Sequence, residues 1–192
     1  MTISAPSPKR AAWALDRLMC RAGSRWAERP AVRRTFTVVS CLGDGWLWYG
    51  LMATLAACAG WRGLYVALHM AGTGFVAWLV YRTLKHRTRW KRPFQVHPGV
   101  VARVRPLDEY SFPSGHTLHA VSFSIVVIAW FPALAFPLIA CAVLIAISRV
   151  VLGLHYPTDV LAGALLGAVL GAGSLRMVHM VIAAIHGSRA PG

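Results

Sequence analysis

Long apolar runs separated by short polar stretches fill the chain after residue 36. Five of these runs cover about residues 37–59, 63–84, 113–132, 133–152 and 158–185. Each is close to the roughly 20 residues that an α-helix needs to cross about 30 Å of hydrocarbon. Small residues crowd the last run, and small side chains let helix backbones approach closely in membrane bundles. The pattern predicts an all-α, integral-membrane bundle of about five transmembrane helices.

The N-terminal segment follows a different pattern. Residues 1–10 are polar and predict a disordered tail, without the apolar core of a secretory signal. Residues 11–35 place tryptophan and leucine among arginines at near-helical spacing, which is typical of an amphipathic helix in the membrane interface. An ordinary soluble helix is the alternative. We therefore expect two parts: a tail with an interfacial helix, 1–35, and a membrane-embedded domain, 36–187.

Composition narrows the class of partner. The 192 residues are 57% hydrophobic and include 20 Lys and Arg against 6 Asp and Glu. Such a charge balance suits nucleic acid, an anionic membrane surface or an anionic substrate. The basic residues adjoin apolar spans and form no nucleic-acid recognition module, so the membrane and a phosphorylated substrate remain as expected partners. The cysteines lack metal or disulfide spacing and are expected to be unpaired: Cys20, Cys41, Cys58 and Cys141.

Three polar stretches interrupt the apolar pattern at the ends of the runs. They are KHRTRWKRP (85–93), PSGH (113–116) and SRVVLGLHYPTD (148–159). Successive spans alternate in direction, so the end of the second span, the start of the third and the junction of the last two meet at one membrane face. A long basic and aromatic loop, 85–112, is expected to cover the same face.

The residue types that meet at this face suit a bound phosphate. Lys85, Arg92 and Arg149 supply three cations. Ser114 and Gly115 begin a helix, where free backbone N–H groups and the positive end of the helix dipole bind phosphate. Glycine also lets the backbone approach a ligand closely, because it has no Cβ.

Two histidines, His116 and His155, reach the same face. Asp159 follows His155 by four residues, a step that would let its carboxylate accept a hydrogen bond from the imidazole Nδ1–H. Such a bond fixes the tautomer and leaves Nε2 free for chemistry. His119 is interpreted as a polar helix edge that can line the pocket, and Asp44 as a residue of the interface or of the bundle interior.

Two other chemistries fit these residues less well. His116, His119, His155 and Asp159 are metal-ligand types, but the sequence has no HExxH motif, paired carboxylates or cysteine cluster. The surrounding cations would also repel a divalent ion. A serine hydrolase built on Ser114 lacks the GxSxG elbow. We therefore expect no metal and no other cofactor.

Together, the three stretches resemble the type 2 phosphatidic acid phosphatase superfamily, which includes the vanadium haloperoxidases. The family pattern is Lys, six residues, Arg-Pro; then Pro-Ser-Gly-His; then Ser-Arg, five residues, His, three residues, Asp. Every defining position is matched between Lys85 and Asp159, and the resemblance covers about residues 40–171. It implies a helical membrane bundle with a phosphate pocket at one face and a metal-free mechanism.

The resemblance also implies roles for individual residues. His155 attacks phosphorus and becomes a phosphohistidine, Asp159 orients it, and His116 protonates the leaving group. The phosphoryl oxygens are held by Lys85, Arg92, Ser114, Gly115 and Arg149, with help from Ser148. Phosphoryl transfer spreads negative charge over these oxygens, so cations and positioning dominate its catalysis.

The implied function is that of an integral-membrane lipid phosphate phosphatase acting on a polyprenyl diphosphate, phosphatidylglycerophosphate or phosphatidate. A lipid phosphotransferase with the same site and a non-catalytic lipid-binding protein of the same fold are alternatives, whereas haloperoxidases are soluble. Apart from Arg62, Arg176 and Arg189, the Lys and Arg residues fall on the motif face. The positive-inside rule therefore predicts a cytoplasmic site in a bacterial inner membrane, although many relatives face the periplasm.

Overall fold

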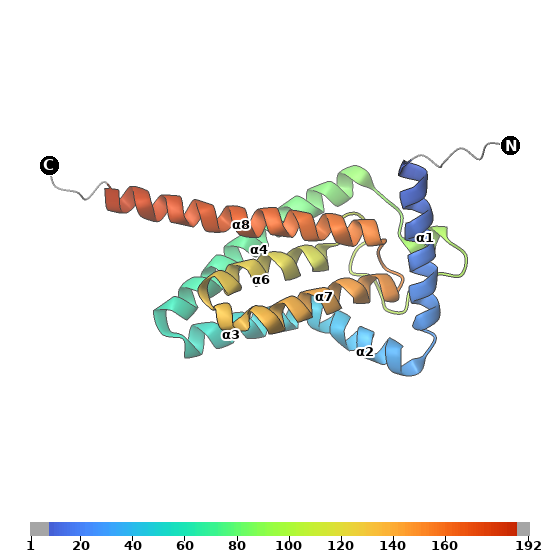
Figure 1. The fold of residues 1–192 in the computed structure, drawn as a ribbon, viewed down its shortest axis with the longest axis horizontal. Helices are drawn as coiled ribbons and strands as arrows, with labels where there is room; N and C mark the ends of the chain where they lie inside the picture. The colour runs from blue at the N-terminus through green and yellow to red at the C-terminus, as the bar shows by residue number, and fades with distance from the viewer. Residues whose placement is uncertain (1–7, 188–192) are drawn as a thin grey trace.

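The described part of the chain, residues 8–187, is built of helices and loops and contains no strand (Figure 1). In this computed structural model the elements are α1 (Pro8–Trp26), α2 (Pro30–Cys41), η1 (Leu42–Trp46), α3 (Leu47–Cys58), α4 (Gly60–Thr88), α5 (Pro93–Val96), α6 (Gly115–Trp130), η2 (Pro132–Leu134), α7 (Ala135–Val151) and α8 (Pro157–Gly187). The all-α prediction is confirmed. Of the predicted disordered tail, residues 1–7 lie outside the described residues, and residues 8–10 already belong to α1.

Three helical stretches are long and apolar enough to cross a membrane: Gly60–Val96, Pro132–Val151 and Pro157–Val181. Helix α6 is apolar as well but shorter. The first predicted span, 37–59, is not one regular helix, because α2 and α3 are joined through the π-helical turn η1 with a kink at Gly45 (φ 136°). That backbone conformation is accessible to glycine at little cost and strained for other residues.

The predicted interfacial helix, 11–35, is divided in two, which corrects that prediction. Helix α1 ends at Trp26, and α2 begins at Pro30 and continues into the first span. Arg29 is extended (φ −68°, ψ 121°) because the ring of a following proline disfavours the helical region. Proline itself suits the first helical position, so the break and the new start have one cause.

Helix α6 lies at the centre of the bundle, in contact with α4, α7 and α8 (Figure 1). The small residues of α8 face it. A Cβ at Gly163 would lie 2.5 Å from the carbonyl oxygen of Ser114, and one at Gly167 would lie 2.5 Å from that of Leu118. Close backbone packing therefore fixes the start of α8 beside the first turn of α6, so the end of stretch 148–159 lies beside stretch 113–116.

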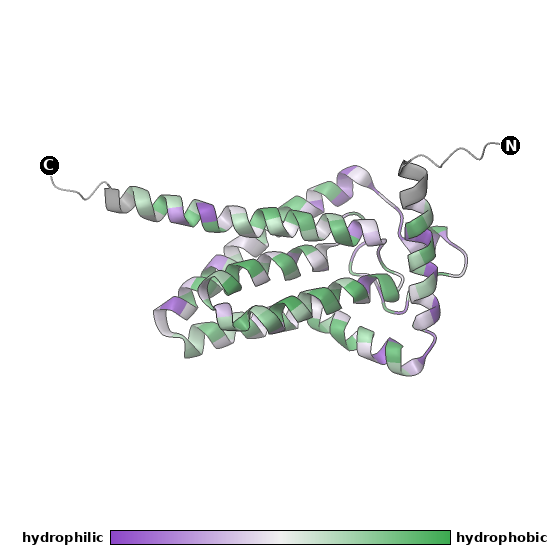
Figure 2. Cartoon of the chain, viewed as in Figure 1, coloured by the Kyte–Doolittle hydropathy of each residue, from purple (hydrophilic) through white to green (hydrophobic). Residues whose placement is uncertain are grey.

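Helix α1 lies across the end of the bundle where α7 ends and α8 begins (Figure 1). Its buried face includes small side chains such as Cys20 and Ser24, whereas Leu15, Leu18 and Trp26 are exposed. In Figure 2 the apolar colour follows the bundle helices, and polar residues mark α1 and the loops beside it. Large apolar side chains on an outer face suit lipid contact, and the interfacial placement of α1 stays a prediction.

Candidate active site

The three polar stretches meet at the α1 end of the bundle. Lys85 lies in the last turn of α4, Arg92 directly before α5, and His155 in the short connection between α7 and α8. Nη1 of Arg92 lies 3.3 Å from Nε2 of His155, although 63 residues separate them in the chain. The alternating directions of the helices bring these ends together, as the count of spans predicted.

His155 is buried, with 1% of its surface exposed. Its backbone N–H donates to the carbonyl oxygen of Arg149 at 3.1 Å, which ties it to the end of α7. Burial lowers the pKa of His155 well below its ordinary value, and the nearby charges of Arg92 and Arg149 lower it further. The imidazole is therefore neutral at neutral pH, which is the form a nucleophile requires.

The carboxylate of Asp159 is held from two sides. Its Oδ2 accepts hydrogen bonds from the backbone N–H of Tyr156 at 2.9 Å and from the hydroxyl of Ser111. Nδ1 of His155 lies 3.6 Å from the same oxygen, which is ion-pair distance but too long for a hydrogen bond. The predicted His155–Asp159 hydrogen bond is thus not formed, and Ser111, which sequence reasoning missed, takes part of its place.

Helix spacing explains this correction. His155 precedes Pro157, the first residue of α8, so the four-residue step to Asp159 does not lie on one helix. Both Nδ1 of His155 and Oδ1 of Asp159 are buried without a hydrogen-bond partner in the described chain. With Nδ1 already 3.6 Å from Oδ2, the carboxylate lies at ion-pair distance from the ring if the imidazole becomes positive.

Lys85 and Arg92 share one carboxylate that the sequence did not single out. Oδ1 of Asp108 lies 2.7 Å from Nζ of Lys85 and 2.6 Å from Nη2 of Arg92. Burial would raise the pKa of Asp108, but Lys85 and Arg92 outweigh it and hold the pKa below its ordinary value. The sequence contains one indication of this role: Asp108 is one of only 6 acidic residues, and it lies in the most basic loop.

The remaining predicted phosphate ligands differ in how they are placed. Arg149 is buried, and its Nη1 donates to the hydroxyl of Ser40 from α2, while its Nε has no partner in the described chain. The Ser148 hydroxyl donates to the carbonyl oxygen of Ile145 at 2.6 Å. Ser148 is therefore bonded within its own helix, and the predicted contact of this hydroxyl with phosphate is not prepared in this structure.

The start of α6 is packed as well as polar. The backbone N–H of Ser114 donates to the carbonyl oxygen of Asp159 at 3.1 Å, so this N–H is not free as predicted. Its hydroxyl lies 3.0 Å from that of Thr117. A Cβ at Gly115 would touch the ring of Tyr81 at 3.4 Å. The first-turn N–H groups that follow Ser114 have no carbonyl partner four residues earlier in the helix and are the remaining candidate donors to a ligand.

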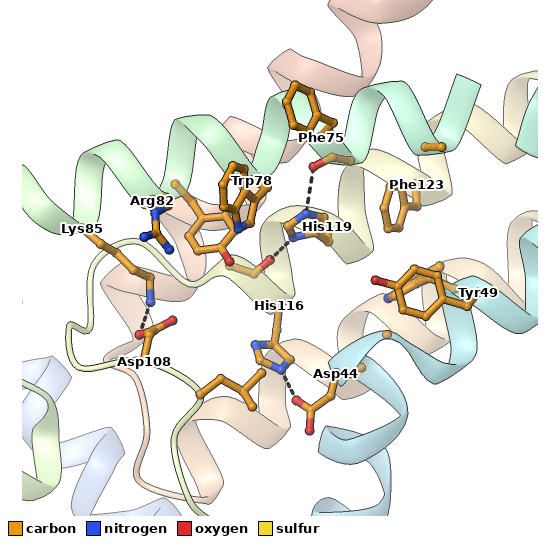
Figure 3. Close-up of a pocket in the computed structure, with 18 of the residues that line it drawn as sticks. Asp44, Tyr49, Phe75, Trp78, Arg82, Lys85, Asp108, His116, His119 and Phe123 are labelled. Carbon is orange, nitrogen blue, oxygen red and sulfur yellow. Dashed lines mark hydrogen bonds and ion pairs between the residues drawn. The ribbon is translucent and has the colours of Figure 1, made fainter. Parts of the chain in front are cut away.

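His116 and His119 face the same opening from α6 (Figure 3). Nε2 of His116 bonds to the carboxylate of Asp44, which reaches it from η1. Asp44 is exposed at this opening, so it is not buried inside the bundle, which was one of the two placements expected. His119 is held on both ring nitrogens, at 2.9 Å from the carbonyl oxygen of Gly115 and 3.2 Å from that of Gly74. His119 is therefore a fixed part of the wall.

A cavity of about 610 Å³ leads away from this opening between α3 and α4. At one end it meets Lys85, Asp108 and His116 (Figure 3). Its walls further along are mainly apolar and aromatic: Trp48, Tyr49, Met52, Phe75, Trp78 and Phe123. The cavity therefore has a cationic end and an apolar remainder, a combination that suits an amphipathic ligand.

Helix α1 supports the segment that carries His155. Asp16 accepts hydrogen bonds from the backbone N–H of Thr158 at 3.1 Å and from its hydroxyl at 2.6 Å. The thiol of Cys20 lies 3.8 Å from the carbonyl oxygen of His155, and burial raises the pKa of this thiol to about 12.

All four cysteines are free, as predicted. Among residues 8–187 no group of three His, Cys, Asp or Glu side chains is arranged to hold a metal.

Comparison with known proteins identifies the class. Over residues 45–183 the chain matches the PAP2 superfamily, and it therefore belongs to that superfamily. It is 33% identical over 160 residues to decaprenylphosphoryl-5-phosphoribose phosphatase of Mycobacterium tuberculosis, across 81% of this chain and 85% of that protein. It is 30% identical over 174 residues to lipid A 1-phosphatase of Rhizobium etli, across 80% and 75%.

A solved structure agrees in fold. The crystal structure of LpxE from Aquifex aeolicus has a TM-score of 0.72 and 25% identity with this chain, covering 92% of this chain and 99% of that one. The protein is thus an integral-membrane phosphatase of the PAP2 type. The family match begins at residue 45, so Asp44 and all of α1 precede it.

Proposed function

We propose that the protein is a lipid phosphate phosphatase that removes a terminal phosphate from a phosphomonoester or diphosphate lipid. A cationic cup around His155 is formed by Lys85, Arg92 and Arg149. The observation that carries the proposal is the continuity of this cup, through Lys85, with the apolar cavity between α3 and α4. When the lipid headgroup lies at Lys85 and His116, the apolar tail can lie in the cavity beside Trp78 and Met52. Two relatives named for lipid phosphates, a decaprenylphosphoryl-5-phosphoribose and lipid A, support this substrate class.

The proposed reaction has two steps. Nε2 of His155 attacks phosphorus, the bond from phosphorus to the lipid oxygen breaks, and His116 gives that oxygen its proton. Water then attacks the phosphohistidine and releases inorganic phosphate, with the neutral His116 accepting a proton from that water. A covalent intermediate divides one hard displacement into two easier ones, and acid–base help of this kind contributes roughly 10²–10⁴-fold.

Electrostatics favours the first step. Lys85, Arg92 and Arg149 lie around His155, and they stabilise the negative charge that spreads over the equatorial phosphoryl oxygens. The same three cations keep the imidazole neutral before attack. Once His155 carries the phosphoryl group it becomes positive, and the buried carboxylate of Asp159 is the counter-charge within reach.

The experiment that tests this proposal is phosphate release from a lipid panel by the detergent-purified protein in the presence of EDTA. The panel holds a polyprenyl diphosphate, phosphatidylglycerophosphate and phosphatidate. We expect activity on at least one lipid, with His155→Ala lower by at least about 10³-fold. His179→Ala, an exposed histidine far along α8, is the matched control and should match wild type. Unchanged activity of His155→Ala would refute the nucleophile.

A hydroxyl acceptor distinguishes hydrolase from phosphotransferase. If a second lipid alcohol replaces water in the last step, phosphate appears on that lipid and not in solution. We propose water as the acceptor. Quantitative release of inorganic phosphate in mixed micelles containing a lipid alcohol supports hydrolysis, and transfer to the alcohol would assign the alternative function.

We also propose that the motif face lies in the cytoplasm, because most Lys and Arg residues lie on that face. The test labels Arg105→Cys, in the loop over the site, with a membrane-impermeant maleimide in intact cells. The native cysteines are replaced by serine, and Trp61→Cys, which is 87% exposed at the opposite end of the bundle, is the control. Labelling of Arg105→Cys but not Trp61→Cys in intact cells would place the site outside.

A further inference from the structure

We propose that Asp108 is an internal competitor for the phosphate site, whose carboxylate stands where a phosphoryl oxygen binds and is displaced by the substrate. The identity of the displacing substrate rests on the proposed function, whereas the contacts of Asp108 do not depend on it. A single oxygen, Oδ1, bridges Lys85 and Arg92 at 2.7 and 2.6 Å. Short contacts of one anionic oxygen with two cations are the contacts that a phosphoryl oxygen makes in such a site.

Access to His155 depends on this carboxylate. Lys85 and Asp108 line the cavity, whereas Arg92 and His155 lie beneath with 1% of their surfaces exposed. The Asp108 side chain is 38% exposed, so it stands at the mouth of the cup. A phosphate that is to reach Nε2 of His155 must occupy the position that Oδ1 now fills.

The segment that carries Asp108 is lightly attached. Within the described chain, the backbone groups of 104–110 make no hydrogen bond to another backbone group. Its polar ties are the ion pairs of Asp108, the carbonyl oxygen of Asp108 on Nε of Arg92 at 3.2 Å, and that of Tyr110 on Lys85 at 2.9 Å. At its ends, Val104 packs against a buried apolar cluster and the ring of Tyr110 lies edge-on to that of His86. At Asp108 itself, the phosphate therefore displaces a carboxylate held by the two cations that the phosphate will bind.

Charge explains why the carboxylate is present before substrate arrives. Lys85 and Arg92 are buried, and a buried cation without a partner destabilises a protein strongly. Asp108 supplies their counter-charge in the empty enzyme. A terminal phosphate offers more negative charge and up to three oxygens, against one engaged oxygen from Asp108, so the exchange favours the phosphate.

A purely structural brace predicts the opposite effect of removing the carboxylate. If Asp108 only positions Lys85 and Arg92, then its loss disorders them and weakens the binding of phosphate. If Asp108 competes, then its loss frees both cations and strengthens that binding. The sign of the change in phosphate affinity therefore separates the two roles.

The test is isothermal titration of inorganic phosphate into the full chain in detergent, for wild type, Asp108→Asn and Glu109→Gln. Glu109→Gln removes the same charge from the next position, where no ion pair forms in the described chain. We expect the Kd for phosphate to fall on the order of tenfold in Asp108→Asn and less than about twofold in Glu109→Gln. An unchanged or higher Kd in Asp108→Asn, or equal tightening in both variants, would overturn the inference.

Folding of the variant is itself informative. Because phosphate can replace the missing counter-charge, Asp108→Asn should gain more in thermal midpoint from phosphate than wild type does. If Asp108→Asn folds only in phosphate buffer, the result supports competition. If both Asp108→Asn and Asp108→Ala fail to fold with and without phosphate, the result refutes it. Phosphate titration needs no turnover, so tightened binding without hydrolysis of any lipid would refute the proposed function alone.

Discussion

The carboxylate of Asp44 accepts a hydrogen bond from Nε2 of His116, across the opening of the cup. Asp44 belongs to η1, beside Gly45 with its φ of 136°. The kink that interrupts the first span therefore directs this carboxylate at the first turn of α6. With Nε2 held, the imidazole of His116 keeps one orientation toward a leaving group, and Asp44 acts as a positioning residue for the proposed proton donor.

We expect Asp44→Asn to impair the proton transfer more than the binding. The kcat for an alkyl phosphate lipid should fall on the order of tenfold, with a small change in KM, because a misoriented acid loses much of its contribution. Hydrolysis of p-nitrophenyl phosphate should fall less, since nitrophenolate departs without a proton. Asp44→Glu should restore part of the kcat. Equal losses on both substrates would show that Asp44 does not act through the proton donor.

Ser111→Ala tests the support of Asp159. The change removes the hydroxyl that bonds Oδ2 of a buried carboxylate, which leaves that oxygen with one donor fewer. We expect unfolding to become easier by about 1–3 kcal/mol and the kcat to fall with it. Thermal unfolding and phosphate-release assays measure the two effects. Ser124→Ala is the control, because this buried hydroxyl bonds only within the bundle, to Ala120 and Leu138.

Gly163→Ala tests the contact between α8 and α6. The new methyl group would meet the carbonyl oxygen of Ser114 at 2.5 Å and push the start of α6 away from Asp159. We expect a loss of about 1–3 kcal/mol in unfolding free energy, together with lower activity. Gly173→Ala, where a Cβ meets nothing within 4 Å, should be neutral or slightly stabilising, because alanine favours a helix. Equal behaviour of the two variants would contradict the packing argument.

Helix direction explains why part of the site was predictable. A run of about 20 apolar residues predicts a span, and the order of the spans determines which ends meet, so the sequence predicts Lys85, Ser114 and His155 at one face. The break at Arg29 was also readable, since the residue before a proline avoids the helical region. The single helix predicted over 11–35 is wrong at this point, because Pro30 follows Arg29.

The contact of Asp44 with His116 and the roles of Asp108 and Ser111 were not predicted, because these three residues have no periodic signal. Asp44 lies in a kinked turn, and Asp108 and Ser111 lie in the loop between α5 and α6. Their positions depend on where irregular backbone folds, which hydrophobic periodicity does not specify. A loop carboxylate beside buried cations could have been suspected from charge alone, because few acidic residues are available to balance Lys85 and Arg92.

The pH profile of kcat/KM tests the electrostatic environment of His155. The nucleophile must be neutral, and a free imidazole has a pKa of about 6.5. Burial, together with Arg92 and Arg149, lowers the pKa of His155, so the neutral form persists into acid and the acid limb of the profile should lie below about pH 6.5.

The matched variants test the cause of this shift. Arg149→Gln removes one of the cations that lower the pKa of His155, so the acid limb should move to higher pH even though kcat/KM falls overall. Arg82→Gln removes an equal charge from the cavity wall, where the guanidinium lies over the ring of Trp78, and should leave the limb in place. An acid limb at or above pH 6.5 in wild type, or equal shifts in the two variants, would show that the cations around His155 do not tune it.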